Sequence, residues 1–197
     1  MKLYVFLFIA FLCSCGQQYS GKISPSLKNG KVDLSKWDFD LDGPAYLKGN
    51  WKLYWSKYIP VKTILEKGIP KDGHILPSPG LWKRHSNRPG QGFATIIGKV
   101  TGVKNLQGLH FHMRPFGTSH KTYISDGNKI QSFTSGINAT NQKDNIPQYK
   151  IFDEILQLEG SDIYIIIHAA NYHYREGGFW GPIKLYKKKN FLTDYHN

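Results

Sequence analysis

The run Ile163-Tyr164-Ile165-Ile166-Ile167-His168-Ala169 has the composition of the most buried strand in the chain. Short apolar runs that are rich in β-branched residues are typical of strands with both faces covered. Polar residues and a glycine pair follow directly, in residues 171–180. We therefore expect the strand to end there and a loop to begin at one end of a β-rich fold.

Shorter strand-like runs lie on both sides of this segment. We expect strands at residues 37–41, a strand pair around residues 49–50, strands at 93–100, 109–114 and 183–186, and a hairpin of 121–124 with 129–133 around Asp126-Gly127. Residues 150–158 fit a strand or a short helix, and residues 61–67 are the best helical candidate. Many short strands with frequent turns and almost no helix predict an all-β fold, an antiparallel β-sandwich or jelly roll.

The N-terminal stretch MKLYVFLFIAFLCSCG, residues 1–16, has a lysine, a short apolar run and then Leu-Cys-Ser-Cys-Gly. The apolar run is too short for a permanent transmembrane helix and has the length of a signal-peptide core. Its end resembles the lipobox of bacterial lipoproteins, in which Cys15 would carry the lipid. We expect a signal peptide at 1–14, a flexible tether at 15–31, the folded domain at 32–190 and a tail at 191–197.

These segments predict an extracytoplasmic, membrane-anchored lipoprotein, in the periplasm or at the cell surface. An ordinary secretory signal or a short membrane anchor remains an alternative. Both cysteines of the chain, Cys13 and Cys15, lie in the targeting segment, so the domain has no disulfide, no thiolate metal site and no cysteine nucleophile.

The formal charge of +12 arises from 26 Lys and Arg against 14 Asp and Glu, mostly scattered singly. A basic balance of this kind suits a solvated surface, anionic head groups or acidic sugars. Because an exported protein rarely meets nucleic acid and no nucleic-acid motif is present, we expect no nucleic-acid partner.

Four motifs in order carry a resemblance to a known family: LKGNWKLYW at 47–55, PGLW at 79–82, GQGFAT at 90–95 and NYHYREGGFW at 171–180. The set resembles the extracellular sensor domain (extracellular domain 2 type) of bacterial seven-transmembrane receptors with diverse intracellular signalling modules, 7TMR-DISM, over residues 32–187. The resemblance implies a jelly roll of galactose-binding-like type that binds carbohydrate or another small ligand. It also implies a link to a membrane signalling protein, commonly a nucleotide cyclase or histidine kinase.

The chain departs from this family in several places. Ile96-Ile97 follow the third motif where the family usually has Tyr and a basic residue, and the central hairpin carries Asp126-Gly127 in place of Asn-Gly. No segment after residue 16 is apolar enough to cross a membrane. We therefore expect either a free-standing lipoprotein or the N-terminal remnant of a split receptor.

The loop at residues 171–180 is the best candidate for a ligand site. It combines an amide, an imidazole, a guanidinium and an indole, which can donate to hydroxyls or carboxylates and offer a flat face to a sugar ring. The expected ligand-binding residues are Asn171, His173, Arg175 and Trp180, joined by Trp82 and by Arg84 of a basic loop expected at residues 83–92. The alternative is structural: Arg175 would pair with Glu176, and Trp180 would fill the core.

Other chemistry finds little support in the sequence. His110 and His112 share one strand face at i, i+2, but no third ligand is placed by spacing, and there is no GxSxG motif. We expect no metal, no cofactor and no catalytic residues. The sequence thus predicts a non-catalytic, membrane-tethered sensory or ligand-binding domain; the alternatives are a structural or protein-interaction lipoprotein and, third, an enzyme that acts on glycans.

Overall fold

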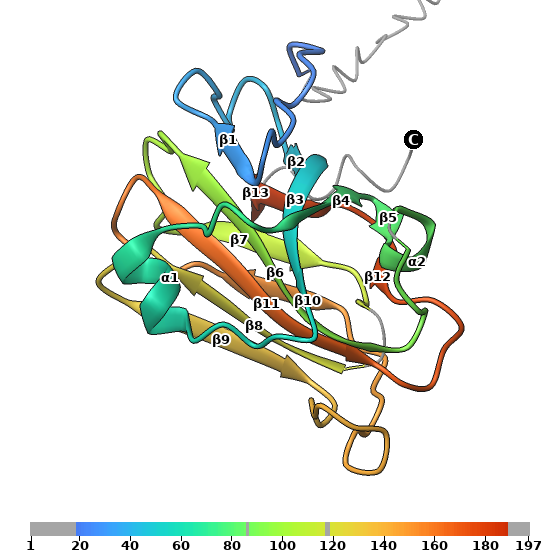
Figure 1. Ribbon diagram of the computed structural model, residues 1–197. Helices are drawn as coiled ribbons and strands as arrows, with labels where there is room; N and C mark the ends of the chain where they lie inside the picture. The colour runs from blue at the N-terminus through green and yellow to red at the C-terminus, as the bar shows by residue number, and fades with distance from the viewer. Residues whose placement is uncertain (1–18, 86, 117–118, 189–197) are drawn as a thin grey trace, which may run out of the picture.

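The structure is a computed structural model that describes residues 19–85, 87–116 and 119–188, and it consists mainly of two facing β-sheets (Figure 1). The larger sheet has the order β4 (His74–Ser78), β3 (Gly49–Trp55), β6 (Gly92–Thr101), β11 (Ile163–Asn171), β8 (Ser119–Ser125) and β9 (Ile130–Ser135), with β1 (Lys31–Asp33) parallel to β6. The smaller sheet has the order β10 (Phe152–Ile155), β7 (Leu109–Met113), β13 (Ile183–Lys187) and β2 (Ala45–Leu47). Apart from β1, the pairings within these two sheets are antiparallel.

The strand expected to be most buried is β11, which lies in the middle of the larger sheet between β6 and β8. Ile163, Ile165 and Ile167 face the smaller sheet and belong to the main core. Ile166 points the other way and packs with Ile64 of helix α1 (Val61–Lys67), which covers part of the outer face. Because both faces of β11 are covered, its sequence has the uninterrupted apolar run that alternation would otherwise break.

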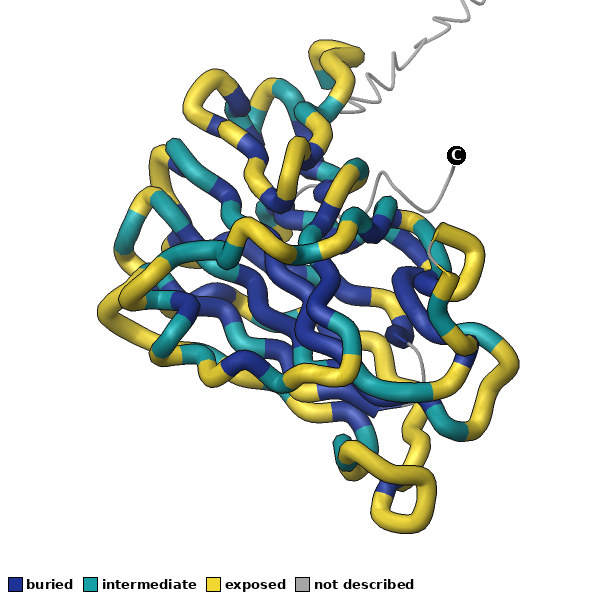
Figure 2. The backbone as a smooth tube through the Cα atoms, in the orientation of Figure 1, coloured by how far each residue is buried: buried dark blue, intermediate teal, exposed yellow. Residues whose placement is uncertain are grey.

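The main core lies between the two sheets, where the tube of Figure 2 is buried along the central strands. Trp51 and Phe111, from opposite sheets, are among its largest fully buried side chains. The hairpin β8–β9 turns at Asp126-Gly127 with Ser125 opposite Ile130, as expected. Within the segment 150–158, which fits either a strand or a short helix by sequence, residues 152–155 form a strand.

The strand expected at residues 37–41 is wrong. Residues 37–38 have no regular structure and residues 39–42 form a turn, because the Asp38 carboxylate accepts the backbone N–H groups of Asp40 and Leu41 and so competes with strand pairing. Trp37 is buried as the alternation implied, whereas Leu41 is 67% exposed.

The two strands expected around Gly49 exist, but they do not pair with each other. β2 pairs with β13 in the smaller sheet and β3 pairs with β4 and β6 in the larger sheet, so the chain changes sheets at this point. Gly49 has a φ of 103°, and a Cβ there would lie 2.6 Å from the Leu27 carbonyl oxygen. Only glycine allows this close crossing.

The described part of the expected tether packs on the domain. The Ser20 N–H donates to the Leu41 carbonyl, Leu27 is 2% exposed in the core, and Lys22 pairs with Asp42 at 2.7 Å. The domain boundary expected at residue 32 therefore moves toward the N-terminus. The signal peptide, Cys15 and the C-terminal tail lie outside the described residues, and among those described no helix is long and apolar enough to cross a membrane.

Candidate functional site

Two segments far apart in sequence meet at one end of the sandwich. The first comprises β5 (Gly80–Leu81) and the short helix α2 (Trp82–His85), whose last three residues lie where a loop is expected from the sequence. The second begins where β11 ends, at Asn171, and includes β12 (Gly178–Phe179). β12 pairs with β5 in a small two-stranded sheet, which fixes the two segments against each other at the right-hand side of Figure 1.

Trp82 lies underneath this site and is fully buried, so its expected role in ligand contact is wrong. Its indole Nε1 donates to the Gly90 carbonyl at 3.0 Å, and its ring packs edge-on against Trp55 with centroids 5.4 Å apart. A Cβ at Gly177 would overlap the Trp82 ring. The glycine thus allows the 171–180 loop to lie directly on the indole.

Asn171 is also fully buried, and its expected role in ligand contact is wrong as well. Its Nδ2 donates to the carbonyls of Gly90, at 2.7 Å, and Tyr174, at 3.0 Å, while its Oδ1 accepts the Tyr174 N–H at 3.1 Å. The amide satisfies backbone groups that burial would otherwise leave unpaired, so it shapes the loop.

Arg84 and Trp180, both expected at the site, do lie together. They line a shallow pocket of about 450 Å³, whose other lining residues are Pro79, Gly80, Leu81, His85 and Phe179. The Arg84 Nε donates to the Glu176 carboxylate at 3.0 Å across the two segments. Glu176 therefore pairs with Arg84, and the alternative in which it pairs with Arg175 is wrong.

Trp180 is 39% exposed and does not fill the core. The exposed rings of Tyr174 and Tyr149 lie beside it, with centroids 5.7 Å and 6.4 Å from that of Trp180. We call these three side chains the aromatic platform. Tyr149 and Tyr174 also border a second hollow of about 130 Å³, next to Pro147 and Gln148.

The sequence did not reveal the two tyrosines of the platform. Tyr174 lies inside the candidate loop, beside the polar residues that make up the predicted site. Tyr149 comes from the loop between β9 and β10, and only the folded chain brings that loop to the site. The overall aromatic richness, with twelve Tyr in the chain, was the only signal available for it.

The remaining two candidates differ in how they are held. The His173 Nε2 lies 2.9 Å from the Asn145 carbonyl and so ties the 171–180 loop to the β9–β10 loop. Arg175 is exposed, and its guanidinium makes no hydrogen bond or ion pair with any residue that the structure describes. Its backbone packs closely against Gly90, so closely that a Cβ at Gly90 would overlap the Arg175 carbonyl oxygen.

The histidine pair that suggested a metal site has protein partners. The His110 Nδ1 lies 3.1 Å from the Asp153 carboxylate, which also accepts the Tyr186 hydroxyl at 2.6 Å. Within residues 19–85, 87–116 and 119–188, no group of three or more His, Cys, Asp or Glu side chains could hold a metal ion.

No protein-family model matches the chain, and no curated protein matches it significantly. Solved structures do match. A β-glucuronidase from an uncultured Clostridium species is similar with a TM-score of 0.51 and 14% identity, over 74% of this chain and 29% of that one. A GH2 β-galacturonidase from Eisenbergiella tayi, bound to galacturonate, has a TM-score of 0.46 and 14% identity, over 73% of this chain and 24% of that one.

The chain thus spans less than a third of the length of these enzymes. At this level of identity the similarity shows the fold alone. The predicted fold class, an antiparallel β-sandwich of galactose-binding-like type, is confirmed.

Proposed function

We propose that this protein is a non-catalytic carbohydrate-binding domain whose ligand lies on the aromatic platform and in the adjoining Arg84 pocket. The observation that carries the proposal is the exposed Trp180, which sits beside two exposed tyrosines and lines a pocket with Arg84. Apolar surface with a few polar groups around it is the usual composition of a small-molecule site. Flat rings suit the apolar faces of sugars, and a guanidinium suits their hydroxyls.

The position of the platform supports the proposal. Binding residues tend to lie on loops that a rigid scaffold positions. Here the buried Trp82 and Asn171 anchor the loops, and the β5–β12 pairing fixes them to each other. The exposed side chains therefore project from a base that needs little ordering when a ligand binds.

The absence of catalysis is part of the proposal, and the chemistry of the site supports it. Glycoside hydrolysis by the common mechanisms requires two carboxylates on either side of the scissile bond. Residues 80–92 and 171–180 contain a single carboxylate, Glu176, and it is engaged with Arg84. The similar solved structures are named as glycosidases. This chain spans only 29% of the Clostridium β-glucuronidase, to which it is similar with a TM-score of 0.51.

The decisive experiment measures binding of a panel of oligosaccharides by thermal shift and calorimetry. A ligand that binds only the folded state must raise the melting temperature. Trp180→Ala should lower the affinity about tenfold, because the ligand loses its stacking partner. Leu41→Ala is the matched control, since Leu41 is an exposed apolar residue outside the platform. Undiminished binding by a folded Trp180→Ala protein would contradict the site.

The membrane tether and the sensor role complete the proposal. They are supported by the lipobox-like sequence at Cys15 and by the resemblance to receptor sensor domains. Cys15→Ala should abolish labelling by a fatty-acid analogue and release the protein from membranes, because lipid chains on this residue would supply the anchor. A neighbouring gene that encodes seven transmembrane helices would support a split receptor, in which this domain reports ligand to a membrane signalling protein.

A further inference from the structure

We infer that the ligand of the aromatic platform is an acidic glycan, one whose sugars carry carboxylate or sulfate groups. This inference rests on the proposed function, since it names the class of carbohydrate that the same site prefers. It is drawn from the charges and the hydrogen-bonding state of the side chains around Trp180.

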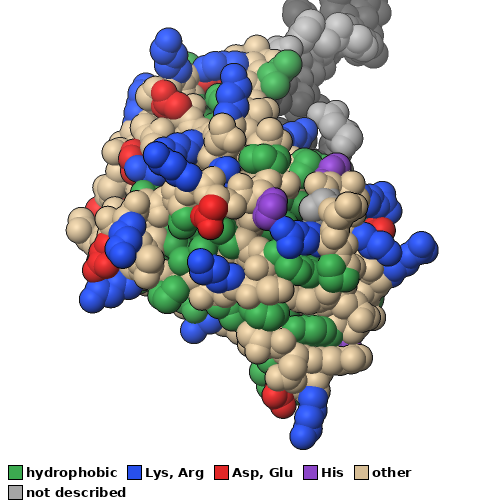
Figure 3. Space-filling model, in the orientation of Figure 1, with side chains coloured by type: hydrophobic (Ala, Val, Ile, Leu, Met, Phe, Trp, Pro, Cys, Tyr) green, Lys and Arg blue, Asp and Glu red, His purple; other side chains and the backbone are tan. Residues whose placement is uncertain are grey.

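Two of the segments that build the site are strongly basic. Residues 80–92 and 171–180 carry four cationic side chains, Lys83, Arg84, Arg88 and Arg175, and the single anion Glu176. Figure 3 shows Lys and Arg side chains gathered at the right-hand edge of the molecule, where α2 lies in Figure 1. Concentrated positive charge beside a pocket attracts anionic ligands and raises their rate of encounter.

Arg84 is available to such a ligand even though it pairs with Glu176. The hydrogen bond to the carboxylate uses Nε, and the guanidinium makes no other hydrogen bond with the described residues. A guanidinium has further donors on its two Nη atoms. Those atoms belong to a side chain that is 67% exposed and lines the pocket next to Trp180.

Arg175 offers a second guanidinium with all its donors unused among the described residues. It directly follows Tyr174 of the platform, and close packing against Gly90 fixes its backbone. Guanidinium groups bind carboxylates and sulfates through paired, charge-assisted hydrogen bonds. Two such groups beside an aromatic surface match a sugar ring that carries an anionic substituent.

The test compares a short oligogalacturonate with its methyl ester, which keeps the rings and removes the charge. A sulfated galactose oligomer of the same length forms the third arm and distinguishes sulfate from carboxylate as the preferred group. We expect at least tenfold tighter binding of one charged oligomer than of the ester, and a loss of that preference at high salt. Arg175→Gln should weaken binding of the charged oligomer about tenfold and leave binding of the ester unchanged.

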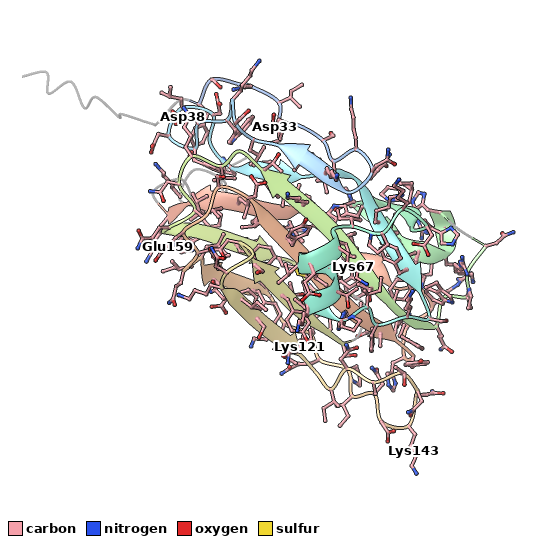
Figure 4. The ribbon with its side chains drawn as sticks, turned by 60° about the vertical axis from the view of Figure 1, so that its left-hand side comes forward. Asp33, Asp38, Lys67, Lys121, Lys143 and Glu159 are labelled. Atoms are coloured by element: carbon pink, nitrogen blue, oxygen red, sulfur yellow. The ribbon has the colours of Figure 1, made fainter. Side chains whose placement is uncertain are left out.

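Lys67→Gln is the matched control, because it removes the same charge from α1, which lies away from α2 in both Figure 1 and Figure 4. It should leave both affinities unchanged. An equal loss for Lys67→Gln and Arg175→Gln would overturn the inference, since the attraction would then arise from the net charge of +12 and not from the site.

The two proposals fail in distinguishable ways. Equal affinity for the charged oligomers and the ester would overturn the preference for acidic glycans and keep the carbohydrate site. Binding of none of the three, and of no other sugar in the panel, would overturn both.

Discussion

The two halves of the candidate site, one buried and one exposed, contain the same kinds of side chain but use them differently. Below the surface, the side chains of Trp82 and Asn171 each donate a hydrogen bond to the Gly90 carbonyl. At the surface, Trp180 lines a pocket and Arg84 makes one hydrogen bond to a neighbouring loop. An indole and a polar side chain thus occur in both halves, and only burial separates the scaffold from the binding surface.

This contrast explains why residue type alone misleads at loops that follow a buried strand. Such a loop must turn away from the core, and its backbone groups near the strand end need partners. Asn171 stands at that position and supplies them. Residues a few positions further along the loop are free of this demand and can serve a ligand.

The largest expected effect comes from the buried half. Trp82→Ala should lower the free energy of unfolding by about 3–5 kcal/mol, because it leaves a cavity beneath both loops and removes one of the two hydrogen bonds to the Gly90 carbonyl. Chemical denaturation measures the loss. Trp180→Ala is the comparison variant, and its stability should change much less because the ring is partly exposed. Similar losses for the two variants would remove the distinction between the halves.

Acid should reveal a second buried polar group in the core, the imidazole of His120, which is 1% exposed. Burial, and to a smaller extent the charge of Lys150, lowers the pKa of His120 to about 4. The unfolded chain takes up this proton near pH 6.5 and the folded chain only near pH 4, so stability falls as the pH drops through that window. The full loss is about 3 kcal/mol.

The measurement is the free energy of unfolding at several pH values for the natural protein and for His120→Gln. The variant should show a shallower fall between pH 6.5 and 4; part of the fall remains, because burial also lowers the pKa of His168. Burial alone would raise the pKa of Asp126, but several backbone N–H donors lower it to about 2, so its contribution is lost at lower pH. Identical pH profiles for the two proteins would contradict the assignment.

The smallest expected effect belongs to the ion pair at the surface. Glu176→Gln should change the free energy of unfolding by at most about 1 kcal/mol, because Arg84 is largely exposed and water screens the pair. The melting temperature should therefore fall by no more than roughly 4 °C. Binding of an acidic oligosaccharide should instead become tighter, since the variant removes the single anion of residues 80–92 and 171–180. Weaker binding would show that Glu176 orients Arg84 for the ligand.

Much of the fold follows from the sequence, since it depends on patterns that are local. The uninterrupted run of β11, the alternation of β7 and the Asp126-Gly127 turn each mark an element within a few residues. The strand that alternation predicts at residues 37–41 does not form, because the Asp38 carboxylate accepts hydrogen bonds from its own neighbours and an apolar pattern does not record such bonds. Pairings between distant strands, such as β12 with β5, have no local signature.

The candidate site was predictable only in part, for the same reason. Arg84 and Trp180 are predicted correctly as neighbours at the site, because a guanidinium and an indole can contact a ligand wherever they lie on the surface. The burial of Trp82 depends on two glycines that are distant in sequence. Gly177 leaves room for the Trp82 indole, and Gly90 leaves room for the Arg175 backbone of the loop above it. Tyr149 reaches the platform from a separate loop, and a single sequence does not contain that proximity.

The docking of the N-terminal segment on the domain has a consequence for the space that the protein can explore. Figure 4 shows Asp33 and Asp38 near the point where the described chain begins, at the end of the domain to which this segment is bound. If Cys15 carries lipid, only four Cα–Cα steps separate it from Tyr19, a reach of about 14 Å. The domain would then stay close to the membrane and diffuse along its surface in two dimensions. Glycans anchored in the same membrane would therefore be present at a far higher local concentration than glycans in free solution.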